Sequence, residues 1–137
     1  MLTDEKLKQE QADEEMINQA FEHLLQSYLT SKHRRKVEII TKAFNFAKQA
    51  HKGVKRRSGE PYIMHPIAVA QIACSEIGLG STSICAALLH DVVEDTDYTV
   101  EDIENLFGPK VAQIVDGLTK ISGGIFGDRA SAQAENF

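Results

Sequence analysis

The sequence predicts an all-α protein, and two observations support this. Apolar residues recur at three- and four-residue steps along most of the chain, a spacing that places them on one face of a helix. Alternation of apolar and polar residues, the pattern of a half-buried strand, does not persist beyond a few positions. The 137 residues, 42% of them hydrophobic, suffice for one domain with its own core but not for two.

Two helices are expected towards the N-terminus. An amphipathic pattern predicts the first helix over about residues 12–30, whereas the polar residues 1–10 are expected to fray. The second helix begins near Val37 and ends near His51. Gly53, just beyond it, suits a left-handed stop.

A loop and two further helices follow. Residues 52–62 are rich in glycine and charge, and we expect a loop there. A third helix should run to about Ile77, with Pro66 in its first turn, where the missing N–H has no helical partner in any case. Gly80 breaks the chain, and Ser81 is expected to cap a fourth helix.

The next two helices carry clear terminal signals. Thr99 and Asp102 resemble a capping box that opens a fifth helix. The pair Gly108-Pro109 stops that helix and starts a sixth, which should end near Thr119.

The C-terminal segment predicts a loop and the start of another helix. Residues 122–128 are expected to form a mobile loop, and a last helix should begin around Arg129. Neither a cap nor a glycine nor a proline follows before Phe137, so we expect this end to be a cut rather than a natural terminus.

Charge and hydropathy restrict the partners. The formal net charge of −5, from 15 Lys+Arg against 20 Asp+Glu, provides no general attraction to nucleic acid or to an anionic membrane. No apolar run approaches the ~20 residues that span a bilayer, and the N-terminus lacks a signal pattern. We therefore expect a cytoplasmic protein that binds neither nucleic acid nor membrane.

The cysteines and three of the histidines suggest structural roles. Cys74 and Cys85 lie in apolar helical segments without CxxC spacing, which favours two buried reduced thiols over a disulfide or a zinc site. His23 and His33 are expected on the surface of the N-terminal helical hairpin. His51 is expected at a helix end, where an imidazolium would interact favourably with the dipole.

The candidate chemistry lies in residues 88–96, Leu-Leu-His-Asp-Val-Val-Glu-Asp-Thr. His90, Asp91, Glu94 and Asp95 occur at i, i+1, i+4 and i+5, so on a helix they share one edge. Acidic side chains gathered on one edge repel one another, and a divalent cation would resolve that conflict.

Metal ligands and acid–base groups can be assigned within this pattern. An imidazole nitrogen beside a carboxylate oxygen suits Mn, Fe, Zn or Mg, so His90 and Asp91 are candidate ligands and His65 is the best further one. Glu94 and Asp95, about one turn later, could act as general base or acid on a water whose pKa the ion lowers. A lone His-Asp pair also occurs by chance, and a carboxylate pair at a helix end is often only solvated.

A basic loop precedes His65 and offers groups for an anionic substrate. Arg56 and Arg57 provide guanidinium forks that suit phosphate oxygens and planes that can stack on a base, and Ser58 adds a hydroxyl. In isolation this loop would be a solvated basic turn. Beside a metal site, it predicts hydrolysis of a phosphate ester.

Several stretches together resemble a known family. They are Arg-Arg-Ser-Gly-Glu-Pro-Tyr-Ile-Met-His-Pro at 56–66, Ala-Ala-Leu-Leu-His-Asp-Val-Val-Glu-Asp-Thr at 86–96, Val-Asp-Gly-Leu-Thr-Lys at 115–120 and Ala-Glu-Asn-Phe at 134–137. They resemble the HD superfamily of metal-dependent phosphohydrolases and, more closely, the hydrolase domain of the RelA/SpoT family, which governs the alarmone (p)ppGpp.

The resemblance implies an all-α HD-domain phosphohydrolase bundle with a single Mn²⁺. It implies removal of the 3′-pyrophosphate from ppGpp or pppGpp, which yields GDP or GTP and pyrophosphate. By position, it implies that His65, His90 and Asp91 are metal ligands and that Glu94 and Asp95 activate water.

The resemblance also assigns the basic loop and the missing ligand. Arg56, Arg57 and Ser58 would form part of the nucleotide pocket, with Arg57 where a lysine is common. In the family the last metal ligand is an aspartate on a later helix, with a substrate-contacting asparagine beyond it. That helix would lie past Phe137.

The resemblance finally implies a longer parent protein. Residues 1–34 would form an N-terminal helical segment that packs on an HD domain at 35–137, truncated before its last metal-ligand helix, and a (p)ppGpp synthetase domain would follow. Two alternatives remain: another HD nucleotide phosphohydrolase, and a degenerate HD module that only regulates a neighbouring synthetase. The intact acidic motif and the Arg-Arg-Ser-Gly-Glu-Pro-Tyr loop favour the (p)ppGpp hydrolase.

Overall fold

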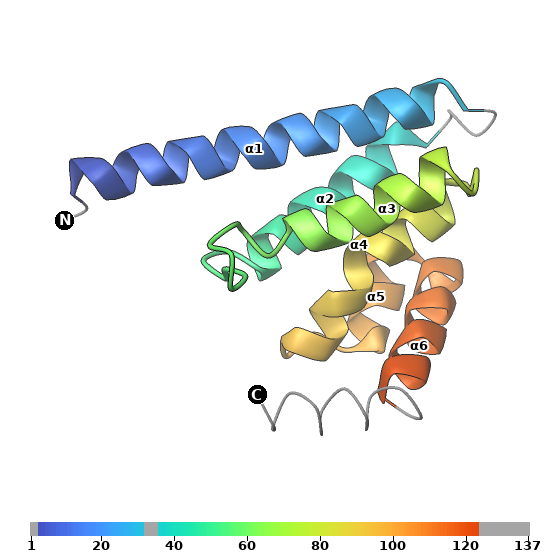
Figure 1. Ribbon diagram of the computed structural model, residues 1–137. Helices are drawn as coiled ribbons and strands as arrows, with labels where there is room; N and C mark the ends of the chain where they lie inside the picture. Colours follow the sequence, from blue (N-terminus) through green and yellow to red (C-terminus); the bar gives the residue numbers. More distant parts are fainter. Residues whose placement is uncertain (1–2, 32–35, 124–137) are drawn as a thin grey trace.

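The computed structural model describes residues 3–31 and 36–123, and within these ranges it contains six helices and no strand (Figure 1). The prediction of an all-α fold is therefore confirmed. The helices are α1 (Asp4–Leu29), α2 (Val37–Ala50), α3 (Met64–Ser75), α4 (Ser81–Asp95), α5 (Val100–Phe107) and α6 (Pro109–Gly123).

Helix α4 lies at the centre of the arrangement. It packs against α2 and α3 on one side and against α6 on the other, while α5 packs on α6 (Figure 1). Ile84, Leu88, Leu89 and Val92 of α4 are fully buried. Burial of large apolar side chains is the main favourable term in folding, so α4 anchors the core.

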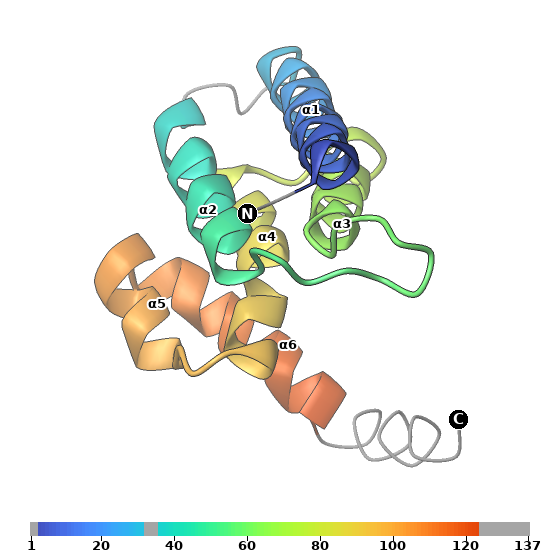
Figure 2. The same ribbon diagram turned by 90° about the vertical axis from the view of Figure 1, so that its left-hand side faces the viewer.

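Helix α1 forms a long outer layer across α3 (Figures 1 and 2). It begins at Asp4, so the prediction that residues 1–10 fray is wrong for the described part of that segment. Thr3 accepts a hydrogen bond from the Lys6 backbone N–H at 3.2 Å, and Asp4 and Glu5 lie at the positive end of the helix dipole. These local terms favour a helix where no apolar face predicts one.

The predicted start and end of the fifth helix are confirmed. Thr99 accepts from the Asp102 backbone N–H at 3.2 Å, and the Asp102 carboxylate accepts from the Thr99 backbone N–H at 2.9 Å. These two reciprocal hydrogen bonds form a capping box. Gly108 ends α5 with a φ of 98°, a conformation that glycine adopts without a steric penalty.

Two other predicted boundaries need correction. Gly80, rather than Ser81, is the N-cap of α4, and its missing side chain leaves no capping hydrogen bond there. Helix α3 ends at Ser75, two residues before the predicted Ile77, because the chain turns early enough for the Leu79 backbone N–H to bond to Ala73 O at 2.9 Å.

Helix α6 continues past the predicted end at Thr119 and reaches Gly123. The first residues of the predicted loop at 122–128 are therefore helical. The rest of that loop, the helix expected from Arg129 and the family-like ending at 134–137 lie outside the described residues, as does His33.

Both cysteines are buried and free, as predicted. Burial raises the pKa of the Cys85 thiol to about 12 and also raises that of Cys74, so both thiols are protonated near neutral pH. Among the helices described, none is long and apolar enough to cross a bilayer.

Candidate metal centre and nucleotide loop

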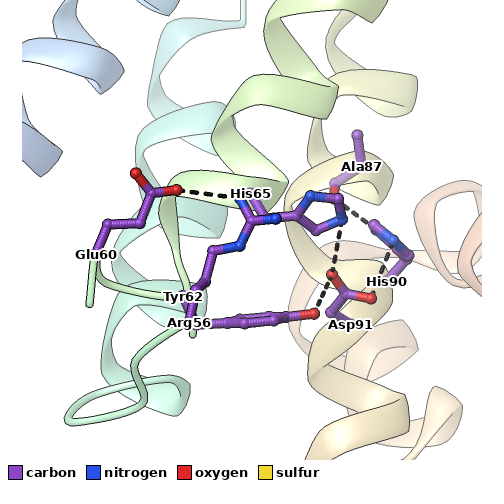
Figure 3. A network of polar contacts seen from close by, with 7 residues as sticks. All are labelled: Arg56, Glu60, Tyr62, His65, Ala87, His90 and Asp91. Atoms are coloured by element: carbon purple, nitrogen blue, oxygen red, sulfur yellow. Dashed lines mark hydrogen bonds and ion pairs between the residues drawn. The ribbon is translucent and has the colours of Figure 1, made fainter. Parts of the chain in front are cut away.

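The carboxylate of Asp91 is the point at which three segments meet (Figure 3). Its Oδ1 lies 3.1 Å from Nε2 of His90, its neighbour on α4. Its Oδ2 accepts a hydrogen bond from the Tyr62 hydroxyl at 2.9 Å and lies 3.9 Å from Nε2 of His65, on α3. Asp91 is only 6% exposed, so these contacts form in a largely dehydrated place.

The surroundings favour a positive charge on His90 and a negative charge on Asp91. Burial alone would raise the pKa of Asp91, but the hydrogen bond and the charge of His90, together with the hydrogen bond from Tyr62, outweigh it, and the pKa is lowered. The hydrogen bond to Asp91 raises the pKa of His90 against the effect of burial, and the charge of Glu94 adds to the increase. The two residues thus favour each other's charged form, and a cation that bound to His90 would have to displace the imidazole proton.

A backbone contact orients the His90 ring. Its Nδ1 lies 2.7 Å from the carbonyl oxygen of Ala87, one turn earlier on α4. When Nδ1–H donates to that carbonyl, Nε2 is the nitrogen directed at Asp91. Metal-ligating histidines commonly have such an outer hydrogen bond, because it selects the tautomer and holds the ring.

The candidate ligands His65, His90 and Asp91 are of chemical types that bind divalent cations, but they do not form a complete coordination shell. Two imidazoles and one carboxylate suit Mn, Fe, Zn or Mg. Across residues 3–31 and 36–123, however, no group of three or more His, Cys, Asp or Glu side chains is arranged to hold a metal ion. His65 and His90 both lie near the Asp91 carboxylate, and a metal ion bound by these three residues would need further ligands to complete its coordination shell.

Glu94 and Asp95 are exposed residues of the last turn of α4. The negative charge of Glu94 acts on His90, whereas that of Asp95 acts on Tyr62 and His51. Both carboxylates are thus electrostatic neighbours of the Asp91 centre, each through a different residue.

The loop between α2 and α3 (residues 54–62; Figure 2) is called the nucleotide loop after the role that the sequence resemblance predicts for it. Hydrogen bonds within its own backbone close it. The Tyr62 N–H donates to Val54 O at 2.9 Å, the Arg56 N–H to Glu60 O at 2.9 Å and the Gly59 N–H to Arg56 O at 2.8 Å. Gly59 has a φ of 90°, which the tight turn requires. The loop is therefore a small ordered unit rather than a free connection.

The three predicted substrate-binding residues lie in the exposed part of this loop. Arg56 pairs with Glu60, Nη1 to Oε1 at 3.0 Å (Figure 3). Arg57 and Ser58 follow it towards the turn. The chain thus presents its cationic groups on the same loop that delivers Tyr62 to Asp91.

Comparison with known proteins identifies the family. The sequence model of the HD domain matches residues 43–136. The chain belongs to the HD domain family. Helix α1 lies outside the matched range, and α2 to α6 lie largely within it.

This HD domain is homologous to SpoT and Rel proteins, as the sequence motifs predicted. It is 48% identical over 112 residues to a Vibrio cholerae protein named guanosine-3′,5′-bis(diphosphate) 3′-pyrophosphohydrolase, covering 82% of this chain and 15% of that protein. It is 44% identical over 119 residues to the Escherichia coli bifunctional (p)ppGpp synthase/hydrolase SpoT, covering 87% of this chain and 16% of that protein. The chain thus spans about 15% of the length of these relatives.

A solved structure supports the same relationship. It is described as a metazoan ortholog of SpoT that hydrolyzes ppGpp and plays a role in starvation responses. It shares 38% sequence identity and a TM-score of 0.55 with this HD domain, over 58% of this chain and 46% of that chain.

His51 lies at a helix end, as predicted, because it is the C-terminal cap of α2. It follows α2 but is only 3% exposed, and its ring centroid lies 4.9 Å from that of Tyr62. Burial lowers its pKa, although the charges of Asp95 and Asp91 oppose the effect, so its surroundings disfavour the predicted imidazolium. The imidazole packs against the ring of Tyr62, beside the Asp91 carboxylate.

The opposite side of the nucleotide loop is attached to α1. Lys55 forms an ion pair with Asp13, a buried residue that also accepts a hydrogen bond from Gln9 at 2.9 Å. The hydrogen bond from Lys55 lowers the pKa of Asp13. A cleft of about 270 Å³ lies beside this pair, between α1 and the loop. None of the three candidate ligands lines this cleft.

Proposed function

We propose that this HD domain hydrolyses the 3′-pyrophosphate of ppGpp or pppGpp, in the cytoplasm and with Mn²⁺, as part of a longer Rel/SpoT-type protein. The observation that carries the proposal is the convergence of His65, His90 and Tyr62 on Asp91, beside a loop that presents Arg56. The names of the homologous proteins support the same activity.

In this proposal His65, His90 and Asp91 hold the cation. A divalent cation supplies Lewis-acid polarisation of a phosphoryl oxygen and makes water more acidic. The protein contributes the orientation of the donors: Ala87 O holds the His90 ring, and the largely buried Asp91 keeps its carboxylate ionised.

Glu94 and Asp95 provide the acid–base chemistry. Water attacks the phosphorus attached to the ribose 3′-oxygen, and that P–O bond breaks, so that pyrophosphate leaves the nucleoside. One carboxylate accepts the proton of the attacking water, and the 3′-oxygen takes up a proton as it departs. Their exposed positions in the last turn of α4 leave both groups accessible to water and substrate.

Arg56, Arg57 and Ser58 bind the nucleotide. Guanidinium forks match phosphate oxygens in a bidentate manner, and their planes can stack on a base. Arg56 is paired with Glu60, and both side chains are substantially exposed, so a phosphate can displace the Glu60 carboxylate at small cost.

We further propose that the parent protein completes the site. The three donors in this chain leave coordination positions open, and the relatives are far longer than the segment that matches. The parent would supply the last ligand from a helix beyond Phe137, and a (p)ppGpp synthetase domain beyond that.

The test is release of pyrophosphate from ppGpp labelled in its 3′-pyrophosphate, with Mn²⁺ present. The gene product that continues past Phe137 should release it at neutral pH, and the 137-residue chain should do so more slowly. Absence of release from the longer product would contradict the proposal. Nucleotide binding without release would indicate the regulatory module, and release from other nucleotides alone would indicate a different HD phosphohydrolase.

A further inference from the structure

Tyr62 is placed between the nucleotide loop and the candidate metal centre (Figure 3). Its backbone N–H closes the loop on Val54 O, while its side chain leaves the loop and reaches Asp91, 29 positions further along the chain. A carboxylate is only an acceptor when ionised, so the Tyr62 hydroxyl is the donor in this contact.

The contact restrains a torsion that is otherwise soft. The terminal torsion of an aspartate, between a tetrahedral and a planar carbon, has broad minima. The Tyr62 hydroxyl donates to Oδ2 of Asp91 at 2.9 Å, and His90 engages Oδ1 at 3.1 Å, so the carboxylate is held at both oxygens. His65 is 3.9 Å from the oxygen that Tyr62 holds. The hydroxyl therefore determines which way the carboxylate faces relative to both histidines.

The ring of Tyr62 is itself held in place. It packs against His51 at 4.9 Å between centroids and lies 6.0 Å from His65. Among the described residues, Nε2 of buried His51 has no hydrogen-bond partner. An unpaired buried polar atom costs free energy, so stability alone does not favour an imidazole here over an apolar side chain of similar size.

We propose that Tyr62 is a positioning residue that orients the Asp91 carboxylate and couples the nucleotide loop to the metal ligands. This inference rests on the proposed function. It means that binding of phosphate by Arg56 and orientation of Asp91 depend on the same short loop. Displacement of the loop would change the ligand set, and loss of the hydroxyl would loosen the loop.

The three tyrosines of the chain allow a matched experiment. Tyr62→Phe removes the hydroxyl that reaches Asp91. Tyr28→Phe removes a buried hydroxyl that accepts from the Lys36 backbone N–H at 3.0 Å, far from the centre. Tyr98→Phe removes the hydroxyl of an exposed ring that packs on Phe46. Each variant differs from the unsubstituted 137-residue chain by one oxygen atom.

Two measurements decide the outcome. The first is Mn²⁺ affinity from paramagnetic broadening of NMR signals, which detects weak binding. Tyr62→Phe should weaken it about 10- to 100-fold, as loss of an outer contact to a ligand does, whereas Tyr28→Phe and Tyr98→Phe should leave it within about twofold. The second is hydrogen exchange of the Arg56 amide, which should be faster only in Tyr62→Phe, even without metal.

Unchanged exchange of the Arg56 amide in Tyr62→Phe would overturn the coupling. Faster exchange together with unchanged Mn²⁺ affinity would make Tyr62 a structural residue of the loop and would equally overturn the proposal. If the unsubstituted 137-residue chain shows no Mn²⁺-induced broadening of NMR signals at His65 or His90, the proposed metal-dependent function fails instead. The exchange measurement then still decides whether Tyr62 couples the loop to Asp91.

Discussion

The two halves of α4 differ in what they do for the molecule. In the first half, Ile84, Cys85, Leu88 and Leu89 are completely buried against neighbouring helices. In the second half, residues 90–95, Asp91 and Val92 are still buried, but Glu94 and Asp95 are exposed. One helix thus carries apolar packing along most of its length and the candidate polar centre towards its C-terminal end.

The buried apolar residues and the exposed carboxylates of α4 are expected to contribute differently to stability and to function. Burial of a leucine contributes about 1.5–3 kcal/mol, whereas carboxylates gathered at a helix end contribute nothing comparable and repel one another. Substitutions of the buried apolar residues of α4 should therefore destabilise the protein, whereas substitutions of Asp91, Glu94 or Asp95 should reduce the proposed activity of a folded protein.

The largest expected effect is that of Leu88→Ala. The fully buried side chain leaves a cavity in the core, so the free energy of unfolding should fall by about 2–5 kcal/mol, as measured by urea denaturation. Leu7→Ala, on an exposed part of α1, is the control and should change stability by less than about 0.5 kcal/mol. Equal losses in the two variants would show that α4 is not the centre of the core.

The second effect is that of Asp91→Asn, which preserves shape and removes the charge. Mn²⁺ affinity should fall at least about tenfold, and the ppGpp hydrolysis proposed for the longer Rel/SpoT-type protein should be lost, while the protein remains folded. Asp97→Asn, at an exposed aspartate just after α4, should leave both unchanged. Unchanged Mn²⁺ affinity in titrations of Asp91→Asn would show that the ligand assignment is wrong.

A third, smaller effect concerns pH and His51. Its pKa in the folded state is lowered from 6.5, mainly by burial, so between that lowered pKa and about pH 6.5 the unfolded chain binds a proton that the folded chain does not. Stability should therefore fall as pH drops below 6.5, with a slope from this group of at most about 1.4 kcal/mol per pH unit. His51→Phe should flatten this part of the profile.

His23 provides the control for this titration because it is exposed on α1. His23→Gln should retain the slope of the parent chain in denaturation experiments at pH 5.5 and 7.5. The raised pKa of His90 has the opposite effect on stability: it adds stability that is lost as pH rises through the folded-state pKa of His90. The contribution of His51 is therefore the difference between the pH–stability profiles of His51→Phe and of the unsubstituted chain. A parent profile identical to that of His51→Phe would contradict a neutral buried imidazole.

The smallest expected effect is that of Lys55→Gln, which breaks the ion pair between the nucleotide loop and α1. Because Lys55 is partly exposed, the loss of stability should be under about 1 kcal/mol, but exchange of the Arg56 amide should become faster. Lys48→Gln removes the neighbouring pair with Glu14, which does not touch the loop, and should leave that exchange unchanged. If both variants behave alike, the attachment to α1 has no role in ordering the loop.

Local patterns predicted most of the helices, because apolar spacing and caps act over a few residues. Thr99 with Asp102 and the turn at Gly108 illustrate this. The place of His51 at the end of α2 was predicted, but its burial was not. That burial was predictable in principle, because His51 continues the buried face of Ile40, Phe44 and Ala47 at three- and four-residue steps.

The candidate centre could be predicted only in part. His90 and Asp91 are adjacent in sequence, and His65 was predicted as a further ligand from its place before Pro66, next to the basic loop. The contact from Tyr62 to Asp91 depends on how the loop folds back over α4, and no local pattern encodes it. The influence of Asp95 on Tyr62 likewise requires the tertiary arrangement, whereas that of Glu94 on His90, one turn earlier on α4, follows from the helical spacing.

The last turn of α4 contains Glu94 and Asp95 and no basic residue. A helix carries a partial negative charge at its C-terminal end, so these carboxylates add to that potential instead of cancelling it. The end of α4 is therefore a region of negative potential that attracts divalent cations before any ligand bond forms. A cation that binds only the folded state also shifts the folding equilibrium towards it, so occupancy and thermal stability should rise together.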